Sequence, residues 1–166
     1  MMKFFDINHW IRGDKFIKDE KNELVRLIKS LSENEIQTAI LTNELSLKYD
    51  WHTGNNELLS NKALLESDNL YLCLILVPEV YITFDFDKYV KSSLAQKVRL
   101  FRLFPKSHLF YINDIYIKKI FKMLSGRRIP IMIDLKELDI TGNKYFAMDE
   151  LSSILEKNPD LPVILE

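Results

Sequence analysis

The first polar side chains able to do chemistry lie in a short apolar run near the N-terminus. Asp6, Asn8 and Trp10 occupy alternate positions there. Because the side chains of a strand alternate between its two faces, these three should share one face while His9 points to the other. The set is suited to contact a polar ligand, with Asp6 as a catalytic candidate and Asn8 and Trp10 as ligand-binding candidates. The alternative is that Asp6 and Asn8 satisfy local backbone groups while Trp10 packs.

A basic pair accompanies another apolar run. Arg102 lies among strand hydrophobic residues, and His108 follows four residues after that strand. A guanidinium at the end of a strand can bind a carboxylate or a phosphate through two parallel hydrogen bonds. The alternative for Arg102 is a structural ion pair with Asp6 or Asp134. His108 is a candidate acid, base or ligand, and its alternative is an exposed loop histidine.

Asp134 and Lys136 end a further apolar run. By strand alternation they share one face, which predicts a lysine–carboxylate pair. Such a pair is either catalytic or structural, and both residues are catalytic candidates. Asp134 is also a weak candidate for a metal ligand.

His52 lies in a predicted loop with Asp50, Gly54 and Asn55. Polar loop residues often carry function, which makes His52 a ligand-binding candidate. The same residues also fit a turn that leads into the N-cap of a helix.

Composition excludes several classes of protein. The 23 basic and 24 acidic residues give a formal net charge of −1, which predicts no binding to nucleic acid or to an anionic membrane. The single cysteine, Cys73, excludes an intrachain disulfide and fits a buried thiol in a reducing compartment. There is no signal-peptide core and no apolar run near the roughly 20 residues that span a bilayer, so we expect a cytoplasmic protein. No nucleophile triad, P-loop or dinucleotide fingerprint is found.

Short apolar runs alternate with helical patterns along the chain. The strand starts are about 25 to 35 residues apart, the length of one strand–helix (βα) unit. Six such units predict a single α/β domain over residues 1–166, built on a parallel sheet. The expected strands are 3–8, 36–42, 70–77, 98–104, 129–135 and 162–165, and the expected helices are 19–31, 56–66, part of 87–95, 113–124 and 148–157.

Five segments, in order along the whole chain, resemble the amidohydrolase-related metal-dependent hydrolases, which have the TIM (β/α)₈ barrel fold. In that family an Asp precedes a His-x-His pair on the first strand, with a Gly shortly after. The segments are FDINHWIRG (5–13), YDWHTGN (49–55) with Leu58, RLFPKSH (102–108), IPIMID (129–134) and NPDLPVI (158–164).

The resemblance implies a barrel with an altered metal site. The two first-strand His ligands would fall on Asn8 and Trp10, the fifth-strand His on Asp134, and the sixth-strand His at or just after Glu166. The family implies a divalent metal such as zinc, but neither Asn nor Trp replaces an imidazole ligand. We therefore expect no metal or other cofactor in this chain.

The chain stops at Glu166, in its sixth predicted strand. A barrel needs eight strands, so we expect about six-eighths of one, as an N-terminal portion or a split product. An open doubly wound sheet is the alternative, since it tolerates a terminal strand.

Two functional hypotheses follow. In the first, the protein derives from enzymes that hydrolyse or decarboxylate a small carboxylate-bearing substrate, and whether this chain is itself an active hydrolase is left open. In the second, it is a non-catalytic module that binds a small anion, or that completes its barrel with a second chain through the exposed edge of its C-terminal strand.

Overall fold

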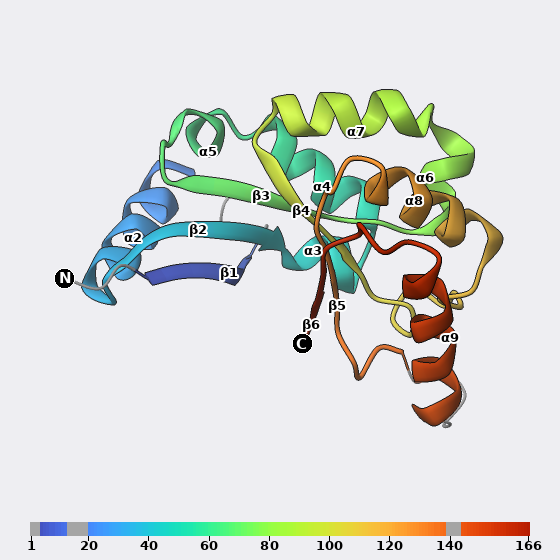
Figure 1. Cartoon of the computed structure of the whole chain (residues 1–166). Coiled ribbons are helices and arrows are strands. Elements are labelled where there is room, and N and C mark those ends of the chain that lie inside the picture. The colour runs from blue at the N-terminus through green and yellow to red at the C-terminus, as the bar shows by residue number, and fades with distance from the viewer. Residues whose placement is uncertain (1–3, 13–19, 139–143) are drawn as a thin grey trace. The chain divides into compact units, whose positions relative to one another are not determined.

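The computed structural model describes residues 4–12, 20–138 and 144–166. Strands and helices alternate along this part of the chain (Figure 1). The strands are β1 (Phe4–Ile11), β2 (Ile36–Asn43), β3 (Leu70–Ile75), β4 (Val98–Leu103), β5 (Ile131–Ile133) and β6 (Val163–Leu165). The helices are α2 (Glu20–Glu33), α3 (Glu44–Lys48), α4 (Trp51–Ser60), α5 (Lys62–Glu66), α6 (Pro78–Thr83), α7 (Phe86–Ala95), α8 (Ile115–Ser125) and α9 (Lys144–Glu156).

The six strands follow one another in the sheet in chain order, β1 to β6. The pairings of β1 with β2, β2 with β3, β4 with β5 and β5 with β6 are parallel. Each parallel step needs a crossover connection, and helices supply it. The predicted α/β fold with serial βα units is confirmed, and strand order in sequence distinguishes it from the doubly wound alternative.

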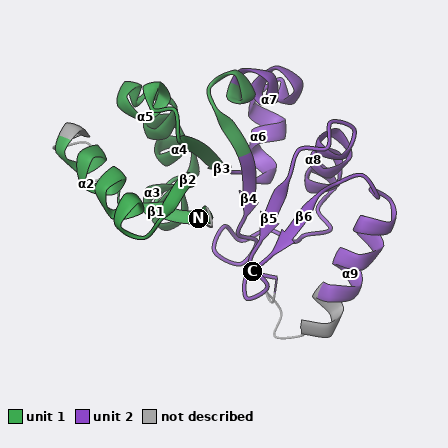
Figure 2. Ribbon diagram, turned by 60° about the vertical axis from the view of Figure 1, so that its left-hand side comes forward, with its two compact units in different colours: residues 1–74, 93–99 green, residues 75–92, 100–166 purple. Residues whose placement is uncertain are grey.

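The chain forms two compact units, which are coloured separately in Figure 2. Unit 1 comprises residues 1–74 and 93–99, and unit 2 comprises residues 75–92 and 100–166. Three ends of the predicted segments lie outside the described residues. They are residue 3 of the first predicted strand, residue 13 of the first motif and residue 19 of the first predicted helix.

In unit 1 the main difference from prediction is the start of the helix expected over residues 56–66. The structure begins α4 at Trp51 and adds the separate helices α3 and α5. Asp50 is the cause, because its carboxylate accepts the backbone N–H of Thr53 at 2.6 Å and so caps α4 five residues earlier. Gly54 therefore lies inside a helix. A Cβ there would come within 2.3 Å of the Ser46 backbone nitrogen and hydroxyl, so a glycine lets α4 approach α3.

Unit 2 follows the prediction closely at α8. Its inward face buries four side chains completely, as the helical spacing predicted: Ile117, Ile120, Phe121 and Leu124. Asp114 caps the helix by accepting the backbone N–H groups of Tyr116 and Ile117, and Gly126 is the C-cap. Helix α6 was missed, because Pro78 ends the apolar run of β3 and also opens a helix at its first position.

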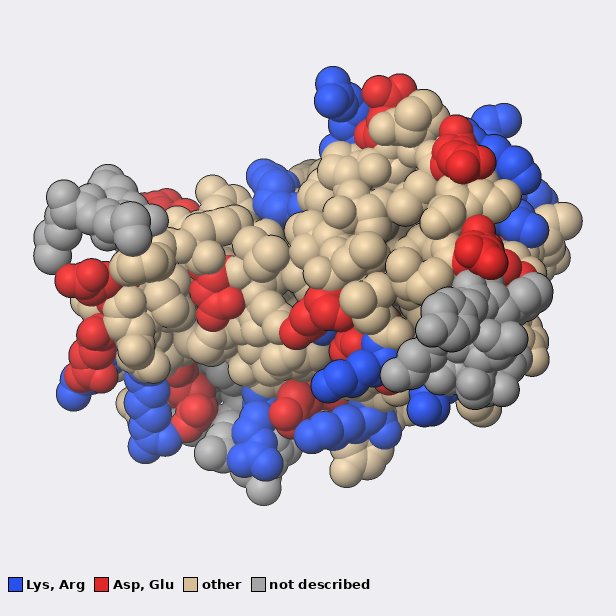
Figure 3. All heavy atoms as spheres, turned by 60° about the horizontal axis from the view of Figure 1, so that its bottom comes forward, with Lys and Arg blue, Asp and Glu red and all other residues tan. Residues whose placement is uncertain are grey.

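The surface is charged with both signs. Acidic and basic side chains intermingle over the face drawn in Figure 3. In the described part of the chain, no helix has the length and apolar character required to cross a bilayer. Cys73 is buried in β3, as its apolar surroundings predicted.

Candidate functional site

Three candidate residues of unit 1, Asp6, Asn8 and Trp10, lie on β1, where the strand does not alternate regularly. From Asp6 to His9 the strand advances three residues while its partner β2 advances two, from Ala39 to Leu41. This bulge brings the His9 Nδ1 atom to 3.0 Å from one Asp6 carboxylate oxygen. The prediction that His9 points away from Asp6 is therefore wrong.

The other Asp6 oxygen accepts the backbone N–H of Asn8 at 2.9 Å. Both carboxylate oxygens of Asp6 are thus engaged by residues two and three positions along its own strand. Asp6 therefore satisfies groups of its own strand, which was the alternative to contact with a ligand. Asn8 and Trp10 are half-buried.

His52 lies on α4, so its assignment to a loop is wrong. Its imidazole is exposed, contacts the side-chain amide of Asn56 at 3.1 Å from Nε2, and meets the Trp51 ring edge-on at 5.4 Å. The side-chain and backbone hydrogen bonds from Thr53 lower the pKa of Asp50, the residue that caps this helix. The polar residues around His52 therefore build a helix N-terminus.

A buried polar residue at the end of β2 did not stand out in the sequence. Asn43 is buried, and its side-chain oxygen accepts the backbone N–H of Leu45 at 2.9 Å. Its amide nitrogen donates to the Gly54 carbonyl at 3.2 Å and to the Glu57 carboxylate at 2.9 Å. An Asn directly after an apolar run is an N-cap signal, and that signal could have identified Asn43 in the sequence. Asn43 ties the end of β2 to α4.

In unit 2 the central residue is Arg102, whose side chain is only 2% exposed. The guanidinium lies over the Phe104 ring, with 4.7 Å between Cζ and the ring centroid. Its Nη2 donates to a carboxylate oxygen of Glu166, whose side chain is 41% exposed. The ion pair given as the alternative for Arg102 therefore exists, but its partner is Glu166 and not the predicted Asp6 or Asp134.

The strand register explains why these two residues meet. Arg102 on β4 pairs with Met132 on β5, which pairs with Ile164 on β6. Residues in register lie on the same face of a sheet. Glu166, one residue past β6, continues the ladder by donating its N–H to the Ile133 carbonyl at 3.1 Å, so its side chain returns to the face of Ile164. Arg102 thus reaches across β5 to β6 at the carboxyl ends of the strands.

The segments that follow β4 and β5 are bound to each other. The carboxylate of Glu137 accepts the backbone N–H of Ser107 at 2.7 Å and its hydroxyl at 3.0 Å, and the Glu137 carbonyl accepts the Lys106 N–H at 3.0 Å. His108, in the first of these segments, is half-buried with its ring edge-on to Phe104 at 6.3 Å. His108 is therefore not the exposed loop histidine of the alternative. No sequence signal pointed to Glu137, since it lies 30 residues from Ser107.

The predicted pair of Asp134 and Lys136 is wrong. Strand β5 ends at Ile133, so alternation no longer applies, and the chain turns. The Asp134 carboxylate accepts the backbone N–H of Lys136 at 2.9 Å. Within the described residues the exposed Lys136 ammonium has no carboxylate partner.

The side chains of the described residues do not form a zinc site of the kind that the resemblance implies. Zinc sites in proteins gather three or four His, Cys or carboxylate ligands. Among residues 4–12, 20–138 and 144–166 there is no group of three such side chains able to hold a metal ion. Asp134 turns to its own backbone and Glu166 to Arg102.

Comparison with known proteins supports the fold. No family model and no curated protein matches the sequence. The solved structures that match include an uncharacterised TIM-barrel protein from Bordetella bronchiseptica (13% identity, TM-score 0.64), a 2,6-dihydroxybenzoate decarboxylase from Rhizobium (11%, 0.67) and an amidohydrolase from Mycobacterium avium subsp. paratuberculosis (16%, 0.54).

The matches cover 98%, 99% and 83% of this chain but only 66%, 66% and 46% of those chains, respectively. The chain therefore has the fold of an incomplete TIM barrel, with six strands and the helices between them, and spans just under two thirds of the first two neighbours.

Proposed function

We propose that this chain is part of an amidohydrolase-like TIM-barrel protein that binds a small carboxylate-bearing substrate at Arg102 and hydrolyses or decarboxylates it. The observation that carries the proposal is a buried guanidinium at the carboxyl end of β4, already paired with a carboxylate. Active sites of TIM barrels lie at this end of the strands. That one structural neighbour is a decarboxylase of an aromatic acid supports the substrate class.

Glu166 occupies the position that a substrate carboxylate would take. Burying a guanidinium is costly unless an anion accompanies it, so a carboxylate that leaves Arg102 should be replaced by another. Glu166 is the more exposed partner, and water can solvate its side chain when it leaves. A guanidinium also has five N–H donors in a planar fork, which suits two-point recognition of a carboxylate.

The chemical step needs a proton donor or a base. Decarboxylation breaks the carbon–carboxylate bond, releases CO₂ and leaves a carbanion that takes up one proton, whereas hydrolysis needs a base to activate water. His108 and Lys136 are the proton-donor candidates and Asp134 is the base candidate in the segments after β4 and β5. Asp6 remains a candidate of unit 1. The described donors do not form a metal centre.

The second candidate function is a non-catalytic module that binds a small anion. It is favoured because the Asp134 carboxylate accepts the backbone N–H of Lys136. The described residues then supply Arg102 to bind an anion, but no assembled pair of Asp134 and Lys136 to transfer a proton. The assembly version of this hypothesis remains a proposal: β6 is last in the strand order and Leu165 is 44% exposed, so a second copy could pair there.

One experiment separates the two candidates. The purified chain is titrated calorimetrically with 2,6-dihydroxybenzoate and with other small carboxylates that carry an amide or ester. The same mixtures are then followed for CO₂, 1,3-dihydroxybenzene and hydrolysis products. Saturable binding with turnover supports the enzyme, and saturable binding without turnover supports the module. If none of these carboxylates binds, both the substrate class and the role of Arg102 are wrong.

A further inference from the structure

A groove lies between helices α8 and α9, and neither Arg102 nor Glu166 lines it. It has a volume of about 760 Å³, within the range of pockets that hold small molecules. It lies wholly in unit 2. The groove is lined by Asn113, Lys118, Lys122, Asp149, Glu150, Ser153, Ile154, Lys157 and Asn158.

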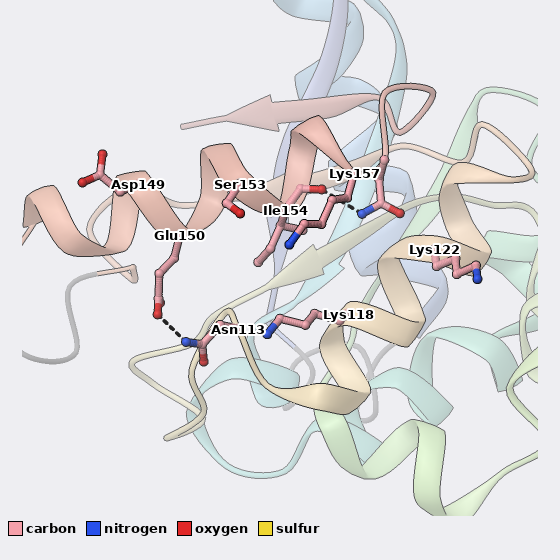
Figure 4. A pocket seen from close by; sticks show the side chains of 9 residues that line it. Asn113, Lys118, Lys122, Asp149, Glu150, Ser153, Ile154 and Lys157 are labelled. Atoms are coloured by element: carbon pink, nitrogen blue, oxygen red, sulfur yellow. Dashed lines mark hydrogen bonds between the residues drawn. The ribbon is translucent and has the colours of Figure 1, made fainter.

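Lysines form one part of the lining. Lys118 on α8 and Lys157, just past the end of α9, extend into the space between the helices from opposite walls (Figure 4). Lys122 lies one turn after Lys118 on α8. In the described part of the chain, none of these three ammonium groups forms an ion pair.

The position of Lys118 near the start of α8 does not by itself favour a cation. It stands four residues into α8, where the positive end of the helix dipole disfavours a cation. Asp114, four residues earlier, accepts hydrogen bonds from Tyr116 and Ile117 as the helix cap. Lys122, four residues later, adds like-charge repulsion. A bound anion would offset both unfavourable terms.

The lining also has an acceptor end. Asp149 and Glu150 lie on α9, and Glu150 accepts a hydrogen bond from the Asn113 side chain (Figure 4). Asp149 is exposed and has no partner among the described residues. Ser153 and Ile154 lie between Asp149 and Lys157 in sequence and offer a hydroxyl and an apolar surface. The groove can thus accommodate a ligand with an anionic end, a flat or apolar middle and a hydrogen-bond donor.

We propose that this groove binds a small organic phosphate. The phosphate group lies between Lys118 and Lys157, the body of the molecule lies along Ser153 and Ile154, and an amino group donates to Asp149. A phosphate monoester carries between one and a half and two negative charges at neutral pH, which matches several lysines better than a single carboxylate does. Lysines bind phosphate as point charges and need no planar geometry.

The test uses AMP as the probe, since it combines a phosphate, a flat ring and an exocyclic amine. The full chain is titrated with AMP, adenosine and inorganic phosphate and followed by heteronuclear NMR. We expect saturable shifts of Lys118, Ser153 and Lys157 with AMP, and binding weaker by about tenfold or more with adenosine. Equal binding of adenosine, or shifts confined to other residues, would overturn the proposal.

Variants give a second readout. Lys118→Gln and Lys157→Gln should each weaken AMP binding by about tenfold. The matched control is Lys119→Gln, which makes the same change of charge on the same helix, because Lys119 lies over the rings of Tyr81 and Tyr116 and not in the groove. An equal loss in the control, or no loss in the other two, contradicts the proposed site. The NMR map of the unmodified chain decides the question if a variant does not fold.

Discussion

The guanidinium of Arg102 and the carboxylate of Glu166 form an ion pair that joins strands β4 and β6 across β5. The two partners are unequal, since the Arg102 side chain is 2% exposed and that of Glu166 is 41% exposed. When its partner is removed, an exposed charge is still stabilised by water. A buried charge instead loses the interaction that compensated the cost of its desolvation. The pair therefore has an asymmetric energetic role.

This asymmetry predicts that Glu166→Ala destabilises the chain more than Arg102→Met does. Removal of Glu166 strands a buried cation and should cost about 1–3 kcal/mol in the free energy of unfolding. Removal of Arg102 leaves a carboxylate that water solvates, and the methionine fills part of the space, so the cost should stay below about 1.5 kcal/mol. Urea unfolding of both variants measures the difference. A larger loss for Arg102→Met would contradict the asymmetry.

Gly54 should not tolerate a side chain. A Cβ at this position would lie 2.3 Å from the Ser46 backbone nitrogen and hydroxyl, so α4 must move away from α3. Gly54→Ala is expected to lower the free energy of unfolding by about 3 kcal/mol or more. The matched control is Gly126→Ala, where the nearest atom to a new Cβ is the Lys122 carbonyl oxygen at 3.6 Å. Thermal unfolding should show a clear loss only for Gly54→Ala.

The cap of α4 should make part of the stability depend on pH. Hydrogen bonds from Thr53 lower the pKa of Asp50 below its usual 3.8. The folded state therefore favours the ionised form: its contribution is fully present above the usual pKa and is lost as the pH falls through the lowered folded pKa. Asp50→Ala should cost about 1 kcal/mol at neutral pH.

Asp50→Asn is the control for this effect, because asparagine caps a helix without titrating. The free energy of unfolding is measured between pH 7 and about pH 2. It should fall less steeply at the acid end in Asp50→Asn than in the unmodified chain. Parallel curves for the two proteins would show that Asp50 is not the titrating group.

Glu137 should hold the segment after β4. Its carboxylate accepts two hydrogen bonds from Ser107, so Glu137→Ala removes both while Ser107→Ala removes only the one to the hydroxyl. Amide hydrogen exchange at Ser107 should accelerate strongly in Glu137→Ala and much less in Ser107→Ala. Unchanged exchange in Glu137→Ala would mean that the backbone bond from Lys106 suffices to order the segment.

Local patterns predicted much of the fold and little of the candidate site. Apolar runs and helical spacing identified six strands in order and the buried face of α8, because burial imposes a periodicity on sequence. The bulge in β1 broke the alternation used to separate His9 from Asp6, and no residue in that run marks a bulge.

The site depends on longer-range contacts. Glu166 lies 64 residues from Arg102 and Glu137 lies 30 residues from Ser107, so only the folded structure reveals either pair. Lys136 failed as a partner of Asp134 because the strand stops at Ile133, one residue before the carboxylate. Strand ends are set by tertiary packing, which a single sequence does not display.

The central claim is that Arg102 binds the carboxylate of a small substrate, and equilibrium titration of two arginine variants tests it most directly. Arg102→Met and Arg99→Met each remove one positive charge from β4, but Arg99 is exposed and donates to the Leu94 and Val98 carbonyls. The account predicts that 2,6-dihydroxybenzoate binds to the unmodified chain and to Arg99→Met with similar affinity. It predicts affinity lower by about tenfold or more for Arg102→Met. Undiminished binding by Arg102→Met would contradict it.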